Sequence, residues 1–457
     1  MKITYSKIEK LRQLLFILIP IFISQLSMIT LTFFDTTMSG HYSPIDLAGV
    51  AIGSSIWVPI FTGLSGILLA VTPIVGQLVG ARKKEKVAFS VIQAIYLAVI
   101  LALIVLALGV FLLNPLLNYM NLETEVHQIA KGYLIALSYG LIPLFVYGVL
   151  RSFIDALGKT RVSMVVTLLS LPINILLNYL LIYGKLGFPE LGGVGAGYAT
   201  SITYWIITIV AALIIHKQKP FVPFRIFQRF FSVSMAKWRE ILAIGVPIGF
   251  AIFFETSIFS AVTLLMSNFN TATIASHQAA INFASALYTI PLSISMTLTI
   301  VVGFEVGAER YKDARDYSLL GITIAIMMAF VTGFILLFFR SEIAGIYTDD
   351  PFVKNLTAHF LLYAIFFQLS DALQAPIQGA LRGYKDVKIT LIMALVSYWV
   401  IGLPLGYFLA NFTTWGPYGY WIGLITGLAV GAICLSIRLI IIQRKMVFQT
   451  YRKIRSS

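Results

Sequence analysis

The sequence predicts an all-helical protein that crosses a membrane twelve times, and two observations carry this prediction. Hydrophobic residues make up 59% of the chain and charged residues only 11%, with a mean hydropathy of +0.90. This composition leaves too little polar surface to coat a soluble globule of 457 residues. The second observation is that 29 of the 33 Lys and Arg residues fall into seven clusters, which separate the apolar stretches in pairs.

The seven basic clusters predict the topology. Basic side chains stay on the cytoplasmic side during insertion, so a cluster at every second loop indicates an even number of crossings with both termini in the cytoplasm. The clusters lie at 2–12, 82–86, 151–161, 217–239, 310–315, 382–388 and 438–455, and the four basic residues outside them are Lys131, Lys185, Arg340 and Lys354. Six pairs of crossings between seven clusters make twelve spans.

The apolar stretches match this number. A span needs about 20 apolar residues to cross a hydrocarbon core of roughly 30 Å. The predicted spans are 13–34, 50–79, 88–113, 129–150, 162–183, 195–215, 241–267, 275–304, 316–339, 355–381, 389–410 and 417–441. The first stretch is longer than a signal-peptide core and lacks a small-residue cleavage pattern, so we expect a retained first helix.

An internal repeat organises these spans. When the sequence is shifted by 227 positions, Pro20 meets Pro247 and Thr72 meets Thr299. In the same register Val75, Gly76, Val79, Gly80 and Ala81 meet Val302, Gly303, Val306, Gly307 and Ala308. We therefore predict two pseudo-symmetric bundles of six helices, an N-terminal lobe at 1–216 and a C-terminal lobe at 240–457, joined by a cytoplasmic linker at 217–239. Two such lobes with the same orientation are typical of carriers that work by alternating access.

Two acidic residues lie deep in predicted spans of the second lobe. Glu255 follows Arg239 by 16 residues and Asp371 precedes Arg382 by 11, which is about 24 Å and about 16 Å along a helix. A carboxylate at this depth costs on the order of 2.5–3.5 kcal/mol and indicates a functional site. Without a cation three or four positions away, each acid either takes up a proton or binds a cation. The alternative for each is an interhelical hydrogen bond that fixes packing.

Asp35 is a third candidate, in the first lobe. About 22 residues separate it from the inner end of its span, so its sequence position also allows a place among the outer headgroups. Asn174 and Asn178 lie one turn apart on one helix face, with Thr200 a weaker candidate on the next span. These side chains could complete an oxygen-rich site around Asp35, or they could only join neighbouring helices.

Five aromatic residues near the acids are candidates for a substrate cavity, because aromatic faces attract flat organic cations. They are Phe253, Phe254, Tyr288, Phe366 and Phe367. The other aromatic residues are expected to contact lipid and form interfacial belts.

Several function classes are disfavoured. The chain has no GxxxxGK[ST] phosphate loop, no HExxH and no Ser/His/Asp setting, so we expect neither ATP-driven pumping nor an enzyme, and no cofactor. The single cysteine, Cys434, excludes a disulfide framework. The net charge of +14 belongs to the cytoplasmic clusters, where anionic lipids rather than nucleic acid are the expected partners. A pore-forming channel stays an alternative, and gradient-driven counterflow would exclude it.

Six segments of the chain resemble the multidrug and toxic compound extrusion (MATE) transporters of the NorM-like bacterial branch, over nearly the whole length. They are FFDTTMSG at 33–40, LAVTPIVGQLVGA at 69–81, LRSFIDALGKTR at 150–161, PIGFAIFFE at 247–255, ASHQAAINF at 275–283 and PLSIS at 291–295. The resemblance implies a cation site at Glu255 and Asp371 and a role in ion coupling for Asp35. It also assigns Asn174 to the first-lobe site. Asn178 stands where some relatives have an acid, which weakens the case for Na⁺ there.

The resemblance implies the MATE fold and export of organic cations, such as fluoroquinolones and dyes, in exchange for Na⁺ or H⁺. The expected location is the inner membrane of a bacterium. A lobed carrier needs no partner chain, so we expect a monomer. The alternative is a lipid-linked oligosaccharide flippase of the same superfamily, whose cavity would carry many basic residues, whereas the spans here are almost free of Lys and Arg.

Overall fold

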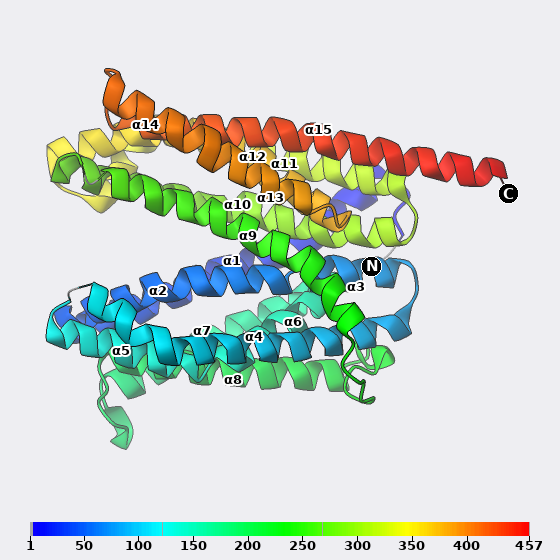
Figure 1. Ribbon diagram of the computed structural model, residues 1–457, viewed down its shortest axis with the longest axis horizontal. Coiled ribbons are helices and arrows are strands. Elements are labelled where there is room, and N and C mark those ends of the chain that lie inside the picture. The colour runs from blue at the N-terminus through cyan, green and yellow to red at the C-terminus, as the bar shows by residue number, and fades with distance from the viewer. Residues whose placement is uncertain (1–2, 121, 267, 457) are drawn as a thin grey trace. The chain divides into compact units, whose positions relative to one another are not determined.

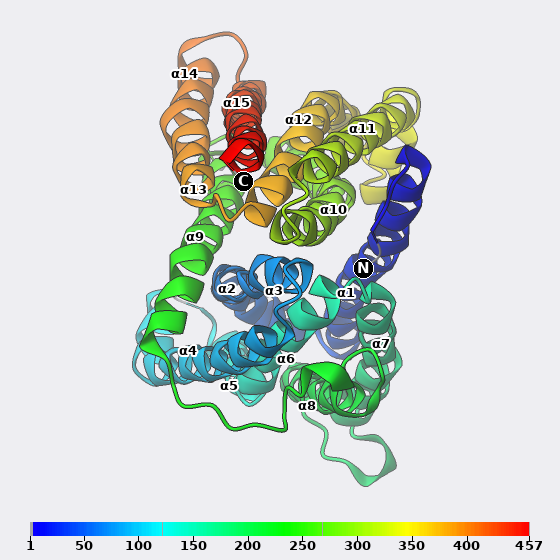
Figure 2. The same cartoon turned by 90° about the vertical axis from the view of Figure 1, so that its right-hand side faces the viewer.

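The computed structural model describes residues 3–120, 122–266 and 268–456, and this part of the chain contains helices and turns but no strand (Figures 1 and 2). The first half holds α1 (Lys7–Tyr42), α2 (Pro44–Leu68), α3 (Val71–Gly80), α4 (Lys84–Tyr119), α5 (Thr124–Ser138), α6 (Leu141–Ala156), α7 (Thr160–Ile182), η1 (Lys185–Gly187), α8 (Gly193–Lys217) and η2 (Val222–Phe224). The second half holds α9 (Met235–Met266), α10 (Thr271–Gly307), α11 (Tyr311–Tyr347), α12 (Pro351–Gly383), α13 (Lys388–Ala394), η3 (Leu395–Gly402), α14 (Leu403–Phe412) and α15 (Tyr418–Ser456).

These helices confirm the predicted membrane fold. Within the described residues, eleven helices are long and apolar enough to span a membrane, α2 with α3 counting as one. A twelfth span forms if α5 and α6, which meet at an angle of 49°, are taken together. The chain is therefore an all-α, multi-pass membrane protein. The cytoplasmic placement of both termini stays a prediction.

The chain folds into two compact units, each with its own core. One unit consists of Met1–Leu18 and Pro247–Ser457, and the other of Ile19–Val246. The core of the first is rich in aromatic residues, among them Phe360, Tyr398 and Trp421. A core cluster of the second includes Val50, Tyr133 and Ile182. The lobe boundaries at 216 and 240 stay a prediction.

The internal repeat is visible in the backbone. At the end of α3, the amides of Ala81, Arg82 and Lys83 donate to the carbonyls of Gln77, Val79 and Leu78, and Arg82 adopts a φ of 58°. At the end of α10, the amides of Ala308, Glu309 and Arg310 donate to those of Phe304, Val306 and Glu305, and Glu309 also has a φ of 58°. Each partner lies 227 residues from its counterpart, so the same helix cap is built twice.

A second cap repeats with the same offset. After α6, the amides of Leu157, Gly158 and Lys159 donate to the carbonyls of Phe153, Asp155 and Ile154. After α12, the amides of Tyr384, Lys385 and Asp386 donate to those of Ala380, Arg382 and Leu381. Gly158 and Lys385 both have a positive φ, of 71° and 59°. The two repeated caps fix the register in which residues of the two halves correspond.

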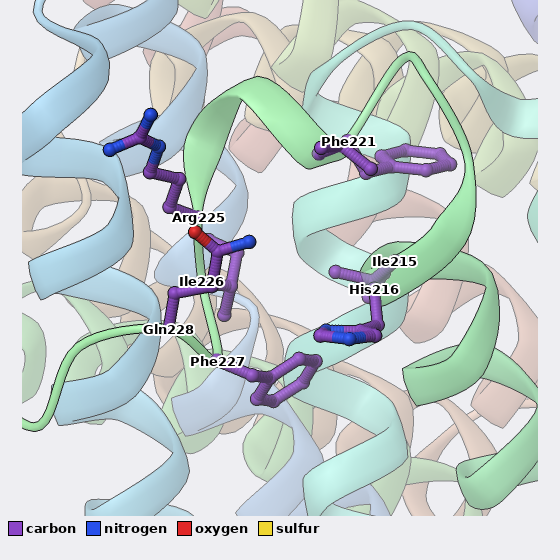
Figure 3. Close-up of a pocket in the computed structure, with 8 residues that line it drawn as sticks. Ile215, His216, Phe221, Arg225, Ile226, Phe227 and Gln228 are labelled. Carbon is purple, nitrogen blue, oxygen red and sulfur yellow. The ribbon is translucent and has the colours of Figure 1, made fainter.

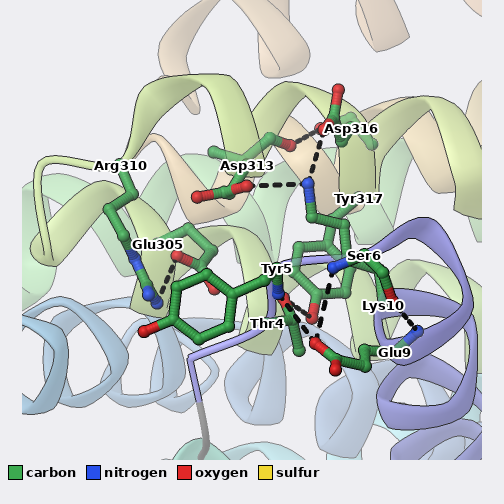
Figure 4. Close-up of polar contacts among 12 residues, drawn as sticks. Thr4, Tyr5, Ser6, Glu9, Lys10, Glu305, Arg310, Asp313, Asp316 and Tyr317 are labelled. Carbon is green, nitrogen blue, oxygen red and sulfur yellow. Dashed lines mark hydrogen bonds and ion pairs between the residues drawn. The ribbon is translucent and has the colours of Figure 1, made fainter.

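The start of α1 is fixed by polar contacts within the first unit (Figure 4). The Ser6 hydroxyl accepts from the Glu9 amide at 3.1 Å and the Glu9 carboxylate accepts from the Ser6 amide at 3.4 Å, which is a capping box. The same carboxylate also accepts from the Tyr5 amide at 2.8 Å. Lys10 Nζ then lies 2.7 Å from Asp313 Oδ1 and 2.5 Å from Asp316 Oδ2, both on α11. These contacts attach residues 3–18 to the end of α11 that carries a basic cluster.

The segment after α8 is held within the other unit. Gln93 on α4 donates from Nε2 to the Ser232 carbonyl at 2.7 Å and accepts at Oε1 from the Ser234 amide at 2.9 Å. The indole of Trp238 donates to the Gln93 carbonyl at 3.1 Å. The predicted linker is therefore an ordered loop.

Candidate cation sites in the two units

Glu255 is the centre of a buried polar group in the unit that holds residues 247–457. It lies on α9, is 8% exposed, and its Oε1 accepts a hydrogen bond from the Tyr398 hydroxyl at 3.3 Å. Tyr398 in turn accepts from Gln374 Nε2 at 2.8 Å. The hydrogen bond from Tyr398 to Glu255 is long, and the Gln378 side chain on α12 lies next to the same carboxylate.

The Tyr398 hydroxyl is positioned by an irregular helix. Residues Leu395–Gly402 form the π-helical segment η3 between α13 and α14, and such segments are frequent at functional sites. The neighbouring Trp399 donates from Nε1 to the Phe254 carbonyl at 3.1 Å, which attaches η3 to α9 next to Glu255. Sequence reasoning missed Tyr398, because its apolar run carries no sign of a widened turn.

Asp371 lies on α12 and is 3% exposed. It interacts electrostatically with Glu255, and Tyr288 on α10 interacts with both acids. The structure therefore brings together the two acids that the sequence placed 116 positions apart. Two interacting carboxylates attract a cation, because a shared positive charge removes their mutual repulsion.

Two buried uncharged oxygen atoms belong to side chains that neighbour Asp371 and Tyr398 along the chain. Gln374 Oε1 and Ser397 Oγ are buried and have no hydrogen-bond partner among the described residues. Both approach Gly431 on α15, where an added Cβ would lie 2.8 Å from Gln374 Oε1 and 3.1 Å from Ser397 Oγ. Carbonyl, hydroxyl and carboxylate oxygens are the ligands that hard cations prefer. The residues present thus fit a small hard cation.

Arg382 brings a positive charge near Glu255 from another helix, outside the three- and four-residue spacings that the sequence could test. The sequence placed it in a loop cluster, but it forms the last turn of α12, is 7% exposed, and donates from Nη2 to Gln378 Oε1 at 3.4 Å. Its charge interacts with Glu255. The spacing of one helical turn between Gln378 and Arg382 was readable from the sequence, but the inward direction of the side chain was not.

Asp35 belongs to a closed ring of hydrogen bonds in the other unit. Its Oδ1 accepts from Asn178 Nδ2 at 2.6 Å and its Oδ2 accepts from the Thr200 hydroxyl at 3.0 Å. Asn174 Nδ2 donates to Thr200 at 3.1 Å, and Asn174 Oδ1 accepts from Asn178 at 3.0 Å. The structure therefore joins all three residues predicted for this site and adds Thr200, which the sequence ranked lower.

The ring presents a donor to each oxygen of the Asp35 carboxylate. An amide and a hydroxyl both point their hydrogens at Asp35, which satisfies its charge without a metal. Asn178 Oδ1, turned away from Asp35, is buried without a partner among the described residues. In this arrangement the ring can hold or release a proton at Asp35, whereas a metal ion would first need the Asn178 amide to turn over.

The five aromatic candidates do not share one environment. Phe367 is 5% exposed and packs against Phe259 and Trp421, with ring centroids 5.7 and 6.2 Å apart. Phe366 is 61% exposed and Phe253 is 40% exposed, while Phe254 and Tyr288 are half-buried. Phe367 thus lies in the core, and the assignment of a substrate cavity to this set stays a prediction.

Some polar residues outside the two candidate sites have contacts that fix helix packing. His277 accepts at Nδ1 from the Trp421 indole at 3.1 Å, and its other ring nitrogen lies 3.2 Å from Thr263 Oγ1. Arg151 and Asp155, one helical turn apart, form an ion pair with Nε and Oδ2 3.6 Å apart. A small pocket after α8 is lined by residues from Ile215 to Gln228 and contains none of the predicted site residues (Figure 3).

The MatE family model matches residues 20–180 and 247–408 of the chain. The two matched segments begin 227 residues apart, which is the offset of the internal repeat. A protein of Bacillus subtilis (strain 168), described as probable multidrug resistance protein NorM, is 61% identical over 445 residues, which is 97% of this chain and 98% of that protein. A protein of the same description from Halalkalibacterium halodurans is 59% identical over 445 residues, 97% of each chain.

Solved structures share the fold. The crystal structure of MATE in the bent conformation superimposes with a TM-score of 0.89 at 20% identity and covers 98% of this chain and 100% of that one. The Vibrio cholerae MATE transporter VcmN has a TM-score of 0.87 at 16% identity, with 96% and 98% covered. The resemblance seen in the sequence motifs is thus confirmed. The chain belongs to the MatE family, within the NorM-like branch of MATE transporters.

Proposed function

We propose that this protein exports organic cations, including fluoroquinolone-like drugs and dyes, in exchange for Na⁺ or H⁺. The observation that carries the proposal is the buried pair of Glu255 and Asp371, with the Tyr398 hydroxyl bound to Glu255 and the Gln374 amide bound to Tyr398. Burying two carboxylates in a membrane costs free energy, which indicates that the pair has a function. If access to the site alternates, the pair can bind a cation from either side of the membrane. The multidrug resistance names of the Bacillus and Halalkalibacterium relatives agree with drug-like substrates.

In this proposal the coupling cation and the organic cation use the carrier alternately. Binding of Na⁺ or H⁺ at Glu255 and Asp371 stabilises one conformation of the two lobes, and its release on the other side allows the carrier to take up a substrate. The protein acts in the inner membrane of a bacterium, as a monomer among anionic lipids, and needs neither a cofactor nor ATP.

The proposal is tested by dye efflux from preloaded proteoliposomes under an inward Na⁺ gradient or an inward proton gradient, each imposed alone. We expect one of them to drive efflux by the unmodified protein, and Glu255→Gln and Asp371→Asn to reduce the driven component at least tenfold. Asn411→Asp, an exposed amide far from the acids in sequence, is the matched control and should keep it. Driven efflux that survives in both acid variants would move coupling to Asp35. No driven efflux with either gradient would contradict multidrug antiport and favour the flippase.

A further inference from the structure

Arg382 is buried although it lies at the end of a membrane helix, where an arginine side chain can normally reach water. It occupies the last turn of α12, and long basic side chains near the end of a membrane helix normally extend to the interface. Here the guanidinium instead turns back by one helical turn to Gln378 and leaves the residue 7% exposed. A buried charge persists only if an opposite charge compensates it. The inward turn therefore requires a counter-ion inside the unit.

The internal repeat shows that the counter-ion is not local. With the offset of 227, Arg382 corresponds to Asp155 and Gln378 corresponds to Arg151. The helix caps after α6 and α12 share this register, so the correspondence is structural. In the first half the pair is Arg151 with Asp155 and is neutral. In the second half the pair is Gln378 with Arg382 and carries one unbalanced positive charge.

The unbalanced charge belongs with the two acids. Asp371, Gln374, Gln378 and Arg382 follow one another at spacings of three, four and four residues, which places them on one face of α12. All four are buried. Gln378 lies next to Glu255, and the charges of Glu255 and Arg382 interact. A continuous polar stripe thus runs from Asp371 to the basic end of the helix, with a negative charge at one end and a positive charge at the other.

We propose that Arg382 is a fixed positive charge of the cation site, so that the site needs one monovalent cation for neutrality. Two carboxylates and one guanidinium sum to a charge of −1, which a single Na⁺ or H⁺ cancels. Arg382 is a positioning residue in this role, since it acts through the charge of Glu255 and does not touch the transported ion. The inference rests on the proposed function of Glu255 and Asp371 and adds the number of cations exchanged in this unit.

The charge count makes a rescue possible. Glu255→Gln leaves Asp371 and Arg382, with a sum of zero, so driven efflux should fall at least tenfold. The double variant Glu255→Gln/Arg382→Gln returns the sum to −1 and should recover driven efflux at least fivefold over Glu255→Gln alone. Arg382→Gln alone, with a sum of −2, should lower the half-saturating concentration of the driving cation at least threefold. It should also raise the Hill coefficient above that of the unmodified protein.

The test uses full-length protein in dye-loaded proteoliposomes, with Na⁺ and proton gradients imposed separately. Arg382→Lys keeps the charge and should keep the unmodified cation dependence, which separates charge from packing. Glu255→Gln/Arg444→Gln removes an exposed positive charge instead and should not recover. The thermal melting of each purified variant in detergent confirms that it is folded.

Two outcomes would overturn the inference. If Glu255→Gln is inactive and the double variant recovers no more than the Arg444 control, Arg382 serves only packing, while the proposed function stands. If Glu255→Gln itself keeps full driven efflux, the acid pair does not couple transport, and both the proposed function and the role of Arg382 fail.

Discussion

At the scale of single residues, the two units compensate a buried carboxylate in different ways. Asp35 accepts short hydrogen bonds from Asn178 and Thr200 on both of its oxygens. Glu255 accepts one bond of 3.3 Å from Tyr398. Hydrogen-bond donors stabilise a carboxylate, and they occupy the positions from which its oxygens would bind a metal ion. We therefore expect metal binding at Glu255 and not at Asp35.

This difference predicts the effect of Asn178→Asp. The substitution replaces the donor 2.6 Å from Asp35 with a second carboxylate, so the two acids repel each other unless a cation lies between them. In a Glu255→Gln/Asp371→Asn background, which removes the other site, we expect Asn178→Asp to create saturable Na⁺ binding where the background shows none. Tryptophan fluorescence of purified protein titrated with NaCl, with choline chloride as the ionic-strength control, measures it.

Asn411→Asp in the same background adds an acid at an exposed position and should leave the titration flat. Saturable Na⁺ binding by the background itself would contradict our reading of the Asp35 ring, because it would mean that the ring already accepts a metal.

Sequence reasoning found the charged members of both sites but not their surroundings. Asp35 was identified because an acid in an apolar run is unusual. Asn174 and Asn178 were identified because two amides one turn apart share a helix face. Tyr398 and Gln374 lie on helices whose crossing brings them to Glu255, and no period within either helix encodes that crossing. The inward direction of the Arg382 side chain was missed because a basic residue at the end of a predicted span is normally expected to lie in the loop.

At the scale of helices, close packing depends on glycines at crossings. Gly379 on α12 lies against α10, and an added Cβ would be 2.1 Å from the Ser295 carbonyl oxygen and 2.6 Å from its Cα. The obstacle is backbone, which cannot move aside as a side chain can. A larger residue at position 379 would therefore force α10 and α12 apart.

Gly379→Ala should therefore destabilise the protein by about 1–3 kcal/mol through overpacking. The melting temperature of the purified protein in detergent, followed by intrinsic fluorescence, measures this change. Gly109→Ala on α4 is the matched control, because a Cβ there meets nothing within 4 Å. The control should be neutral or stabilising by up to about 1 kcal/mol, since alanine favours a helix. Equal melting of the two variants would contradict the tight α10–α12 crossing.

Apolar runs predicted every span but not the ends or breaks of the helices. Hydropathy detects the part of a helix within the hydrocarbon, whereas α1 starts at Lys7 because Ser6 and Glu9 cap it beyond the predicted start at 13. The break between α2 and α3, the bend between α5 and α6, and the π-helical η3 lie inside apolar runs. Mean hydropathy over a run does not register such local changes of helix geometry, so the runs could not reveal them.

At the scale of the whole molecule, the two halves share their helix caps and differ in their polar sites. The two halves share two caps at an offset of 227, whereas Arg151 with Asp155 in one half corresponds to Gln378 with Arg382 in the other. Divergence of the charged positions on a common scaffold gives the units different chemistry. We infer that the unit with Glu255 and Asp371 couples transport to a cation.

The central claim, obligatory exchange of an organic cation for a coupling cation, is tested most directly by uphill transport. Proteoliposomes are prepared with the same concentration of a monovalent cationic dye inside and outside, and a tenfold gradient of Na⁺ or H⁺ is then imposed with the membrane potential clamped. One-for-one exchange predicts that the dye moves opposite to the flow of the cation and accumulates up to about tenfold on the cation-rich side, and that the dye gradient reverses when the cation gradient is reversed. Asp371→Asn should show none. A dye that stays equally distributed under both gradients, in either direction, would contradict cation-coupled antiport.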